Sequence, residues 1–305
     1  MAGDTSIEWC DKVWNPIVVC SIVSPGCTNC YAMKMAGRWR LKSGSIYAGL
    51  TNPSHGGPVW NGKLALASEE TLTIPLRWKR PKRIFVNSMG DLFHKDAPEA
   101  WVDRVFAVMA LAPQHTFIVL TKRSARMREY LGTVGPDDAE DRIFRAQFHI
   151  APASGHEVKD WPLPNVWLGV SCERQAEADE RIPDLLATPA AVRFVSAEPL
   201  LGPVDFTNHD PTGIQAGMKA HGWSSIWRNN LIGRPWLDWI IVGAESGPHA
   251  RPMELQWAGD ILAQCKGAGV AAFMKQLSGP GGRAIKDIAK FPNGLRVREY
   301  PRAAS

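Results

Sequence analysis

The sequence predicts an α/β protein in which short buried strands alternate with helices, arranged as a partial or complete (β/α) barrel of the TIM type. Two observations predict this class. Apolar, β-branched runs recur along the chain, as in strands buried on both faces of a parallel sheet. A polar segment, and usually a helical pattern, follows each run, and a doubly wound open sheet is the alternative arrangement. The runs are 83–86, 116–120, 166–170, 192–195, 239–242 and 271–274, with a seventh at 14–19.

Helices are predicted between the runs from capping residues and apolar stripes. Asp96 and Glu99 have the spacing of a capping box before a helix over 101–112. Ser124 is the candidate N-cap of the next helix. The other expected helices cover 125–131, 174–187 and 254–268.

The domain organisation is predicted to be a single barrel-like domain over 1–305, because no clean linker divides the chain. Two irregular excursions, 31–75 and 203–238, break the alternation and are rich in turn residues. Long excursions in a compact domain are often lids or binding loops. We therefore expect both to lie near a ligand site.

The composition is that of a folded protein without membrane spans. Hydrophobic residues make up 45% and charged residues 21% of the chain, which excludes a disordered protein. No apolar run approaches the roughly 18 residues that cross a bilayer. The first residues, Met1–Ser6, have no secretory leader pattern, so we expect a cytoplasmic protein. The net charge of +5 is compatible with nucleic acid as a partner without requiring it.

Three of the six cysteines, Cys20, Cys27 and Cys30, fall within eleven residues. In a reducing compartment such a cluster indicates a metal site or catalysis rather than a disulfide framework. The C-x-x-C spacing lets two thiolates face one metal centre, and Pro25-Gly26 provides a turn that folds Cys20 back toward them. Three thiolates suit a 4Fe–4S cluster with one iron left open.

Two other interpretations of the cysteines remain open. Zinc held by three cysteines needs a fourth ligand, for which Cys10, Cys172 or a histidine is a candidate. In the second interpretation, the three thiols are reduced core cysteines that bind no metal. Cys265 falls on the apolar stripe of the predicted helix over 254–268 and is expected to be a bystander.

Polar residues follow the apolar runs where the strands are expected to end. The carboxyl ends of parallel strands form the ligand face of both candidate folds, so these residues are the predicted site. The cations among them either bind an anionic ligand or pair with glutamates such as Glu173 in the barrel mouth. The candidate catalytic residues are Asn87, Asp91, Lys122, Arg123 and Lys275. The candidate cofactor-binding residues are Ser171, Ser196, Glu198, Glu245 and Ser246.

Motifs along nearly the whole chain carry a family resemblance. They include Ser6-Ile7-Glu8-Trp9, Trp14-Asn15-Pro16, the cysteine segment 24–32, and segments 75–78, 85–93, 119–123, 165–171, 194–200 and 241–247. Together they resemble the phage-associated three-Cys-motif proteins, a family of unknown function. Members of that family are often encoded beside a three-Cys-motif partner protein, which the resemblance implies as a partner here.

The three-Cys-motif family is in turn similar to radical S-adenosylmethionine (SAM) enzymes. Those enzymes hold a 4Fe–4S cluster on three cysteines after the first strand of a partial barrel, and SAM binds the open iron. The resemblance implies that Cys20, Cys27 and Cys30 hold the cluster and that the cofactor-binding set named above faces SAM. This sequence departs from the superfamily pattern, because six residues rather than three separate its first two cysteines.

A second class of function is a nucleic-acid-binding module stabilised by zinc or by a cluster. The run Arg77-Trp78-Lys79-Arg80-Pro81-Lys82-Arg83 combines positive charge with an aromatic side chain, as single-strand binders do. A run of this kind is more often a solvated face before a strand. A third possibility is a phage or defence component that acts through a protein partner.

Overall fold

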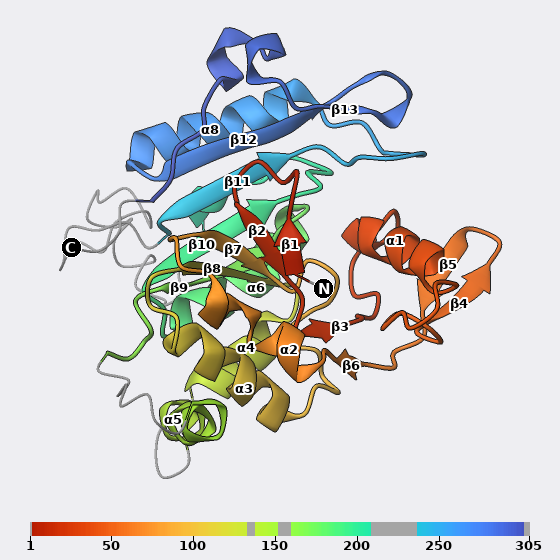
Figure 1. The fold of residues 1–305 in the computed structure, drawn as a ribbon. Coiled ribbons are helices and arrows are strands. Elements are labelled where there is room, and N and C mark those ends of the chain that lie inside the picture. The colour runs from red at the N-terminus through yellow and green to blue at the C-terminus, as the bar shows by residue number, and fades with distance from the viewer. Residues whose placement is uncertain (1, 133–137, 152–159, 209–236, 302–305) are drawn as a thin grey trace. The chain divides into compact units, whose positions relative to one another are not determined.

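The six apolar runs all form strands of the main sheet in the computed structural model, which describes residues 2–132, 138–151, 160–208 and 237–301 (Figure 1). Each strand begins at its predicted residue, and all but the first extend past the predicted end. Most residues in them are buried, as expected for strands covered on both faces. The strands are β7 (Arg83–Val86), β8 (Thr116–Thr121), β9 (Val166–Ser171), β10 (Val192–Ala197), β11 (Trp239–Gly243) and β12 (Ala271–Ser278).

The seventh run, 14–19, does not form one strand. Trp14 ends β2 (Lys12–Trp14), which pairs in parallel with β7. Ile17 and Val18 form β3 (Ile17–Val18), which pairs with β6 (Ala65–Leu66) in a separate two-stranded sheet. The residues between them are Asn15 and Pro16, and proline has no N–H to donate to a ladder.

The predicted α/β class is confirmed, as a mixed fold with a large and mostly parallel sheet. The strand order is β1-β2-β7-β8-β9-β10-β11-β12-β13. β1 (Ala2–Asp4) and β13 (Ala284–Ile285) pair antiparallel with their neighbours at the two ends of this order. Within the described ranges the order is therefore open at both ends, and no closed barrel is found.

The chain forms two compact units, and β9 contributes residues to both. The first consists of Met1–Val23, Cys30–Trp167 and Pro189–Ala191. The second consists of Ser24–Asn29, Leu168–Thr188 and Val192–Ser305. The cysteine segment is thus divided, with Cys20 and Cys30 in the first unit and Cys27 in the second.

Helices of the first unit differ from prediction at their starts. α3 (Glu99–Ala110) has Pro98 as its N-cap without a side-chain hydrogen bond, so the predicted capping box is wrong. Asp96 lies outside the helix, where the backbone of residues 94–97 turns, and pairs with Lys95. Ser124 is the first residue of α4 (Ser124–Gly132) rather than its cap. α5 (Ala139–Ile150), which packs against α3, was not predicted.

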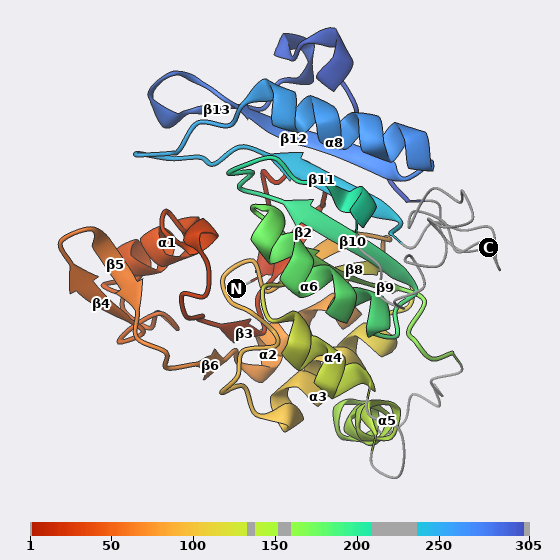
Figure 2. The ribbon, with the colours of Figure 1, turned by 180° about the vertical axis from the view of Figure 1, so that it is seen from behind.

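The second unit contains the helices predicted over 174–187 and 254–268. α6 (Gln175–Ala187) contacts β10, and α8 (Leu255–Ala268) lies along β11 and β12 (Figure 2). Gly269 ends α8 in the left-handed conformation (φ 71°), which a side chain would disfavour. The shorter helical turns are η1 (Pro25–Cys27), η3 (Phe206–Asn208), η4 (Pro280–Gly282), η5 (Ile288–Lys290) and η6 (Asn293–Leu295).

The excursion over 31–75 is an ordered part of the first unit. It contains α1 (Tyr31–Trp39), the hairpin of β4 (Thr51–Ser54) and β5 (Gly57–Trp60), and the short α2 (Glu69–Leu72) and η2 (Ile74–Arg77). α1 packs against the hairpin, as both ribbon views show (Figures 1 and 2). The excursion over 203–238 falls outside the described residues except at 203–208 and 237–238. None of the helices in the described ranges is long and apolar enough to span a membrane.

Candidate functional site

The chain reaches the first cysteine through a strained residue. Val19 has a φ of 87°, which is an outlier for a β-branched residue, and its N–H donates to the carbonyl of Met89 (3.0 Å). Gly90 permits this close approach, because a Cβ there would lie 2.8 Å from the carbonyl oxygen of Ile17. Strain of this kind collects at functional sites. It fixes the direction in which the chain enters Cys20.

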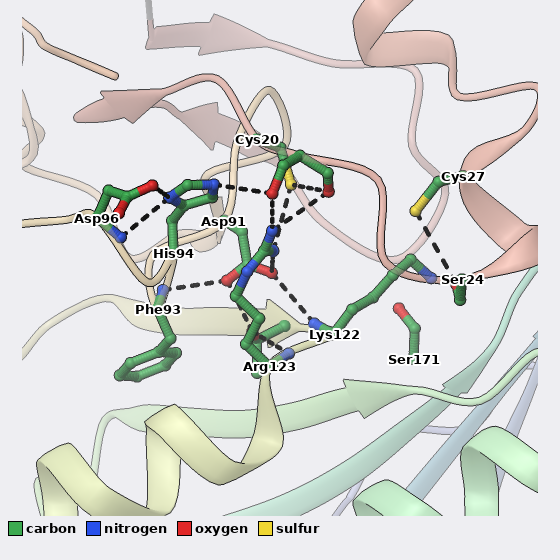
Figure 3. Close-up of polar contacts among 12 residues, drawn as sticks. Cys20, Ser24, Cys27, Asp91, Phe93, His94, Asp96, Lys122, Arg123 and Ser171 are labelled. Atoms are coloured by element: carbon green, nitrogen blue, oxygen red, sulfur yellow. Dashed lines mark hydrogen bonds and ion pairs between the residues drawn. The ribbon is translucent and has the colours of Figure 1, made fainter. Parts of the chain in front are cut away.

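The Cys20 sulfur lies beside a guanidinium. Nη1 of Arg123 donates to Sγ of Cys20 (3.3 Å) and to Oδ2 of Asp91 (2.8 Å), and Nη2 donates to Oγ of Ser21 (2.8 Å) (Figure 3). A guanidinium at this distance stabilises a sulfur that carries negative charge, the form in which cysteine binds metal. Both terminal nitrogens of Arg123 are therefore engaged within the first unit.

Asp91 is the anchor of this arrangement. Its carboxylate accepts hydrogen bonds from the Thr121 hydroxyl (2.7 Å) and from the backbone N–H groups of Phe93 (3.0 Å) and Lys122 (3.2 Å). The structure thus brings together Asp91, Lys122 and Arg123, which the sequence placed after β7 and β8. Asp91 lies in the loop between β7 and α3, which starts eight residues later.

Burial opposes the positive charge of Arg123, but Asp91 and Cys20 outweigh burial and raise the pKa of the guanidinium above its ordinary value. The sequence left two interpretations of the cations at the strand ends: they bind an anionic ligand, or they pair with an acidic side chain. For Arg123 the structure gives that pairing, with Asp91 rather than Glu173 as the acid.

His94 holds the residue after Cys20. Its Nδ1 accepts from the backbone N–H of Asp96 (3.2 Å), which leaves Nε2 to donate to the Ser21 hydroxyl (3.0 Å). Burial, followed by the charge of Arg123, lowers the pKa of His94 despite the nearby aspartates. The neutral imidazole is therefore the form that this network favours. Ser21 was not among the predicted site residues, although it adjoins a cysteine in sequence.

We expect folding stability to fall as the pH is lowered from 7.5 toward 5.5. The unfolded chain takes up a proton on His94 near pH 6.5, whereas the folded chain, with its lowered pKa, takes it up only at lower pH. His115 is also buried with a lowered pKa and contributes to the same trend. Urea unfolding midpoints across this range should show a smaller pH dependence in His94→Gln. The matched control is His55→Gln, at an exposed turn, and an equal slope in all three proteins would contradict the assignment.

Cys20 and Cys30 are both packed against an apolar cluster built largely from the excursion over 31–75. The cluster includes Met33, Tyr47, Trp60 and Met89. Tyr31 extends from the start of α1, and its hydroxyl donates to the carbonyl of Ser88 (2.7 Å), after β7. The excursion therefore shields two of the three cysteines on their apolar side.

Asn87 is buried at the end of β7, and only the oxygen of its side-chain amide has a hydrogen-bond partner. Its Oδ1 accepts from the N–H of Ile17 (3.3 Å), but its Nδ2 has no hydrogen-bond partner. A buried donor without a partner is uncommon and calls for an explanation such as a ligand. Asn87 also has a φ of 58°, in the region that asparagine tolerates better than most residues.

The segment Ser24–Asn29 belongs to the second unit, where Glu173 receives it after β9. The Ser24 hydroxyl donates to Oε1 of Glu173 (3.0 Å). It also lies 3.9 Å from Sγ of Cys27 (Figure 3). Gly26 packs on the same carboxylate, where a Cβ would lie 2.2 Å from Oε1. Arg181 donates to the other oxygen, Oε2 (3.1 Å), and both members of this pair are almost wholly buried.

Asn29 is held by a second carboxylate, at the end of β11. Its Nδ2 donates to Oε2 of Glu245 (2.9 Å), and Arg251 donates to both oxygens of Glu245 through its side chain. Burial raises the pKa of Glu245, but the hydrogen bonds from Arg251 and Asn29 outweigh burial and lower it. The carboxylate therefore stays charged. Ser246, the adjacent predicted residue, is exposed.

Glu198 and Lys275 form an ion pair across β11. Glu198 follows β10, and Lys275 lies in β12. Gly243 of β11 leaves space for the Glu198 side chain, since a Cβ at Gly243 would lie 3.2 Å from Cδ of Glu198. This pairing is one of the two interpretations of Lys275. Ser171 and Ser196 are buried in the neighbouring strands, and Oγ of Ser196 has no hydrogen-bond partner.

The remaining cysteines are buried, and no disulfide joins any of the six. Burial raises the pKa of Cys265 on α8 to about 12, which keeps it a neutral thiol. Cys10 and Cys172 lie at other places in the two units. Across the described part of the chain, no three or more His, Cys, Asp or Glu side chains are grouped as ligands of one metal ion.

The basic run lies before β7. Arg77, Lys79 and Arg80 are exposed there. The Trp78 ring is packed, with the ammonium of Lys12 5.8 Å from its centroid and the His115 ring in edge contact. The Trp78 ring is thus half-buried and has contacts within the protein.

Comparison with known protein families gives a match over most of the chain. The model of the family described as "Protein of unknown function (DUF5131)" matches residues 4–298. No curated protein and no solved structure matches the chain.

Proposed function

Because this chain belongs to the DUF5131 family, whose description names no function, we propose a function from the site itself: it is an iron–sulfur protein that uses SAM in the manner of radical-SAM enzymes. Cys20, Cys27 and Cys30 would hold a 4Fe–4S cluster. The observation that carries the proposal is the position of these cysteines. They come after β2, the first strand that pairs in parallel in the main sheet, with the short β3 between β2 and Cys20, and they lie outside any disulfide. The carboxyl ends of such strands form the ligand face of α/β folds.

The chemistry of the side chains suits such a group, although no three ligand-type side chains are grouped around one metal ion in the described residues. Three thiols form the donor set of a cluster that leaves one iron open. The guanidinium of Arg123 donates to the sulfur of Cys20, and an apolar cluster packs on Cys20 and Cys30. At the end of β7, Nδ2 of Asn87 is a buried donor without a hydrogen-bond partner, which a ligand would satisfy.

A cluster held by three cysteines supplies an electron to SAM when both are bound. The chain's own residues prepare the site for that chemistry. Arg123 and Asp91 fix the charge beside Cys20, and His94 holds the adjoining Ser21. The excursion over 31–75 supplies apolar side chains that pack against Cys20 and Cys30.

The polar strand ends of the second unit are the proposed cofactor side. Glu198 with Lys275, and Glu245 with Asn29, place charged and amide groups at the ends of β10, β11 and β12. An ammonium, a carboxylate or a ribose hydroxyl of SAM matches these groups in charge and hydrogen bonding. We also propose that the main sheet forms a partial barrel similar to that of radical-SAM enzymes. The parallel pairings β2–β7–β8 and β10–β11–β12 support it.

Anaerobic reconstitution with iron and sulfide tests the proposal. We expect brown protein with about four iron and four sulfide per chain. After reduction with dithionite it should convert SAM to 5′-deoxyadenosine, measured by chromatography. Cys20→Ser, Cys27→Ser and Cys30→Ser should each lose most of the iron, whereas Cys265→Ser should retain it, because Cys265 is buried on α8.

Three results would count against the proposal in different ways. Colourless protein with stoichiometric zinc would replace the cluster by a structural metal site. A stable cluster without SAM cleavage would leave an iron–sulfur protein of another kind. Retention of the cluster in all three cysteine variants would show that the ligands lie elsewhere.

A further inference from the structure

Arg123 connects a buried acid to the sulfur of the first cysteine. Its Nη1 lies 2.8 Å from Oδ2 of Asp91 and 3.3 Å from Sγ of Cys20 (Figure 3). The side chains of Arg123 and Asp91 are 10% and 5% exposed, so water screens their charges little. A guanidinium remains protonated at any pH relevant to a protein. Cys20 therefore has a permanent positive charge and an N–H donor beside it.

The position of this guanidinium is fixed from several directions. Nη2 donates to the carbonyl (3.2 Å) and hydroxyl (2.8 Å) of Ser21, which His94 holds in turn. Asp91 is held by three further donors from the segment after β7 and from the end of β8. Neither charge has room to move away from Cys20 without breaking several hydrogen bonds. The pair is thus built to present a defined charge to one sulfur.

We propose that Arg123 is a positioning residue that raises the reduction potential of the cluster through its N–H···S bond to Cys20, and that Asp91 limits this effect by partly neutralising the guanidinium. The inference rests on the proposed iron–sulfur function. Reduction adds one electron, and hence negative charge, to the cluster. Hydrogen bonds to the sulfurs and nearby positive charge favour the reduced form.

The test compares Arg123→Gln, Asp91→Asn and Arg126→Gln with the wild type, all reconstituted anaerobically. Arg126 is the matched control, because it lies on α4, which begins directly after Arg123, and pairs with the exposed carboxylates of Glu99 and Glu129. The readout is the ratio of reduced to oxidised cluster, measured by electron paramagnetic resonance at a fixed potential set by dithionite and redox dyes. It does not depend on turnover.

Opposite shifts are expected in the two site variants. Arg123→Gln should lower the ratio about tenfold, which corresponds to about 59 mV for a one-electron couple. Asp91→Asn should raise the ratio, because the guanidinium then acts on Cys20 without its counter-charge. Arg126→Gln should match the wild type. Arg123→Lys keeps the charge but lacks the planar fork, and should lower the ratio less than Arg123→Gln does.

The outcomes separate this inference from the function on which it rests. Wild-type protein that binds no iron overturns the proposed function and this inference with it. Normal iron content with an unchanged ratio in both site variants overturns the inference alone. So does a shift of the same sign in Arg123→Gln and Asp91→Asn, which is what a merely structural role would give. If Arg123→Gln fails to fold, Asp91→Asn against Arg126→Gln still decides, because an unshifted Asp91→Asn overturns the inference.

Discussion

Replacing Arg181 with methionine should lower the free energy of unfolding by about 3–5 kcal/mol. The reason is that the substitution leaves the buried carboxylate of Glu173 without its counter-charge. Glu173 is fully buried, with an exposed fraction of 0%, and Arg181 is its counter-charge at 3.1 Å. Arg181 also donates to the carbonyl of Ser171 (2.8 Å), so the substitution leaves a buried carbonyl short of a partner as well. Urea unfolding followed by circular dichroism measures the loss.

A double variant separates charge from packing. Arg181→Met combined with Glu173→Gln removes both charges, so it should be less destabilised than Arg181→Met alone. Arg126→Met is the control, since its partners are exposed carboxylates and surface pairs of this kind contribute about 0–1 kcal/mol. A loss in Arg181→Met no larger than that in the control would contradict a buried pair.

The same pair bears on the cysteine segment, because Glu173 also accepts from Ser24 and packs on Gly26. The Glu173→Gln protein should therefore show faster alkylation of Cys27 by iodoacetamide than the wild type, because a neutral amide accepts the Ser24 hydrogen bond less strongly than a carboxylate does. Mass spectrometry of the alkylated peptide would resolve Cys27 from Cys20 and Cys30.

Replacing Gly90 with alanine should destabilise the first unit by about 1–3 kcal/mol. The new Cβ would lie 2.8 Å from the carbonyl oxygen of Ile17 and 3.0 Å from that of Val19. Both are backbone atoms, so neither can turn aside as a flexible side chain would. Relief requires a shift of the segment that leads through Val19 into Cys20, and we expect iron retention to fall together with the unfolding midpoint.

Gly259 provides the control for the same substitution with the opposite expected sign. It lies inside α8, and a Cβ there would have no atom within 4 Å. Gly259→Ala should therefore stabilise the protein by about 0.5–1 kcal/mol, because alanine loses less conformational freedom than glycine in a helix. If both alanine variants changed stability equally, the close approach at Gly90 would not be the cause.

The predicted strands show how much of the fold lies in local pattern. Six apolar runs predicted six strands, because a strand buried on both faces needs consecutive apolar residues whatever its neighbours are. The seventh run failed at Asn15-Pro16, where a single missing N–H ends the ladder and redirects the chain into β3. The capping box at Asp96 failed because Pro98 fixes the start of α3.

In the candidate site, too, the sequence determined some features and the tertiary structure decided the others. The sequence by itself determined which residue types stand at the carboxyl ends of the strands, since those ends follow directly from the apolar runs. It also determined the spacing of Cys20, Cys27 and Cys30. Only the tertiary structure decided the partners: Asp91 for Arg123, Glu198 for Lys275, and Arg181 for Glu173. Such pairs join residues from different elements, and their choice depends on which strands are neighbours and on where a glycine leaves room. No local pattern of residues contains that information.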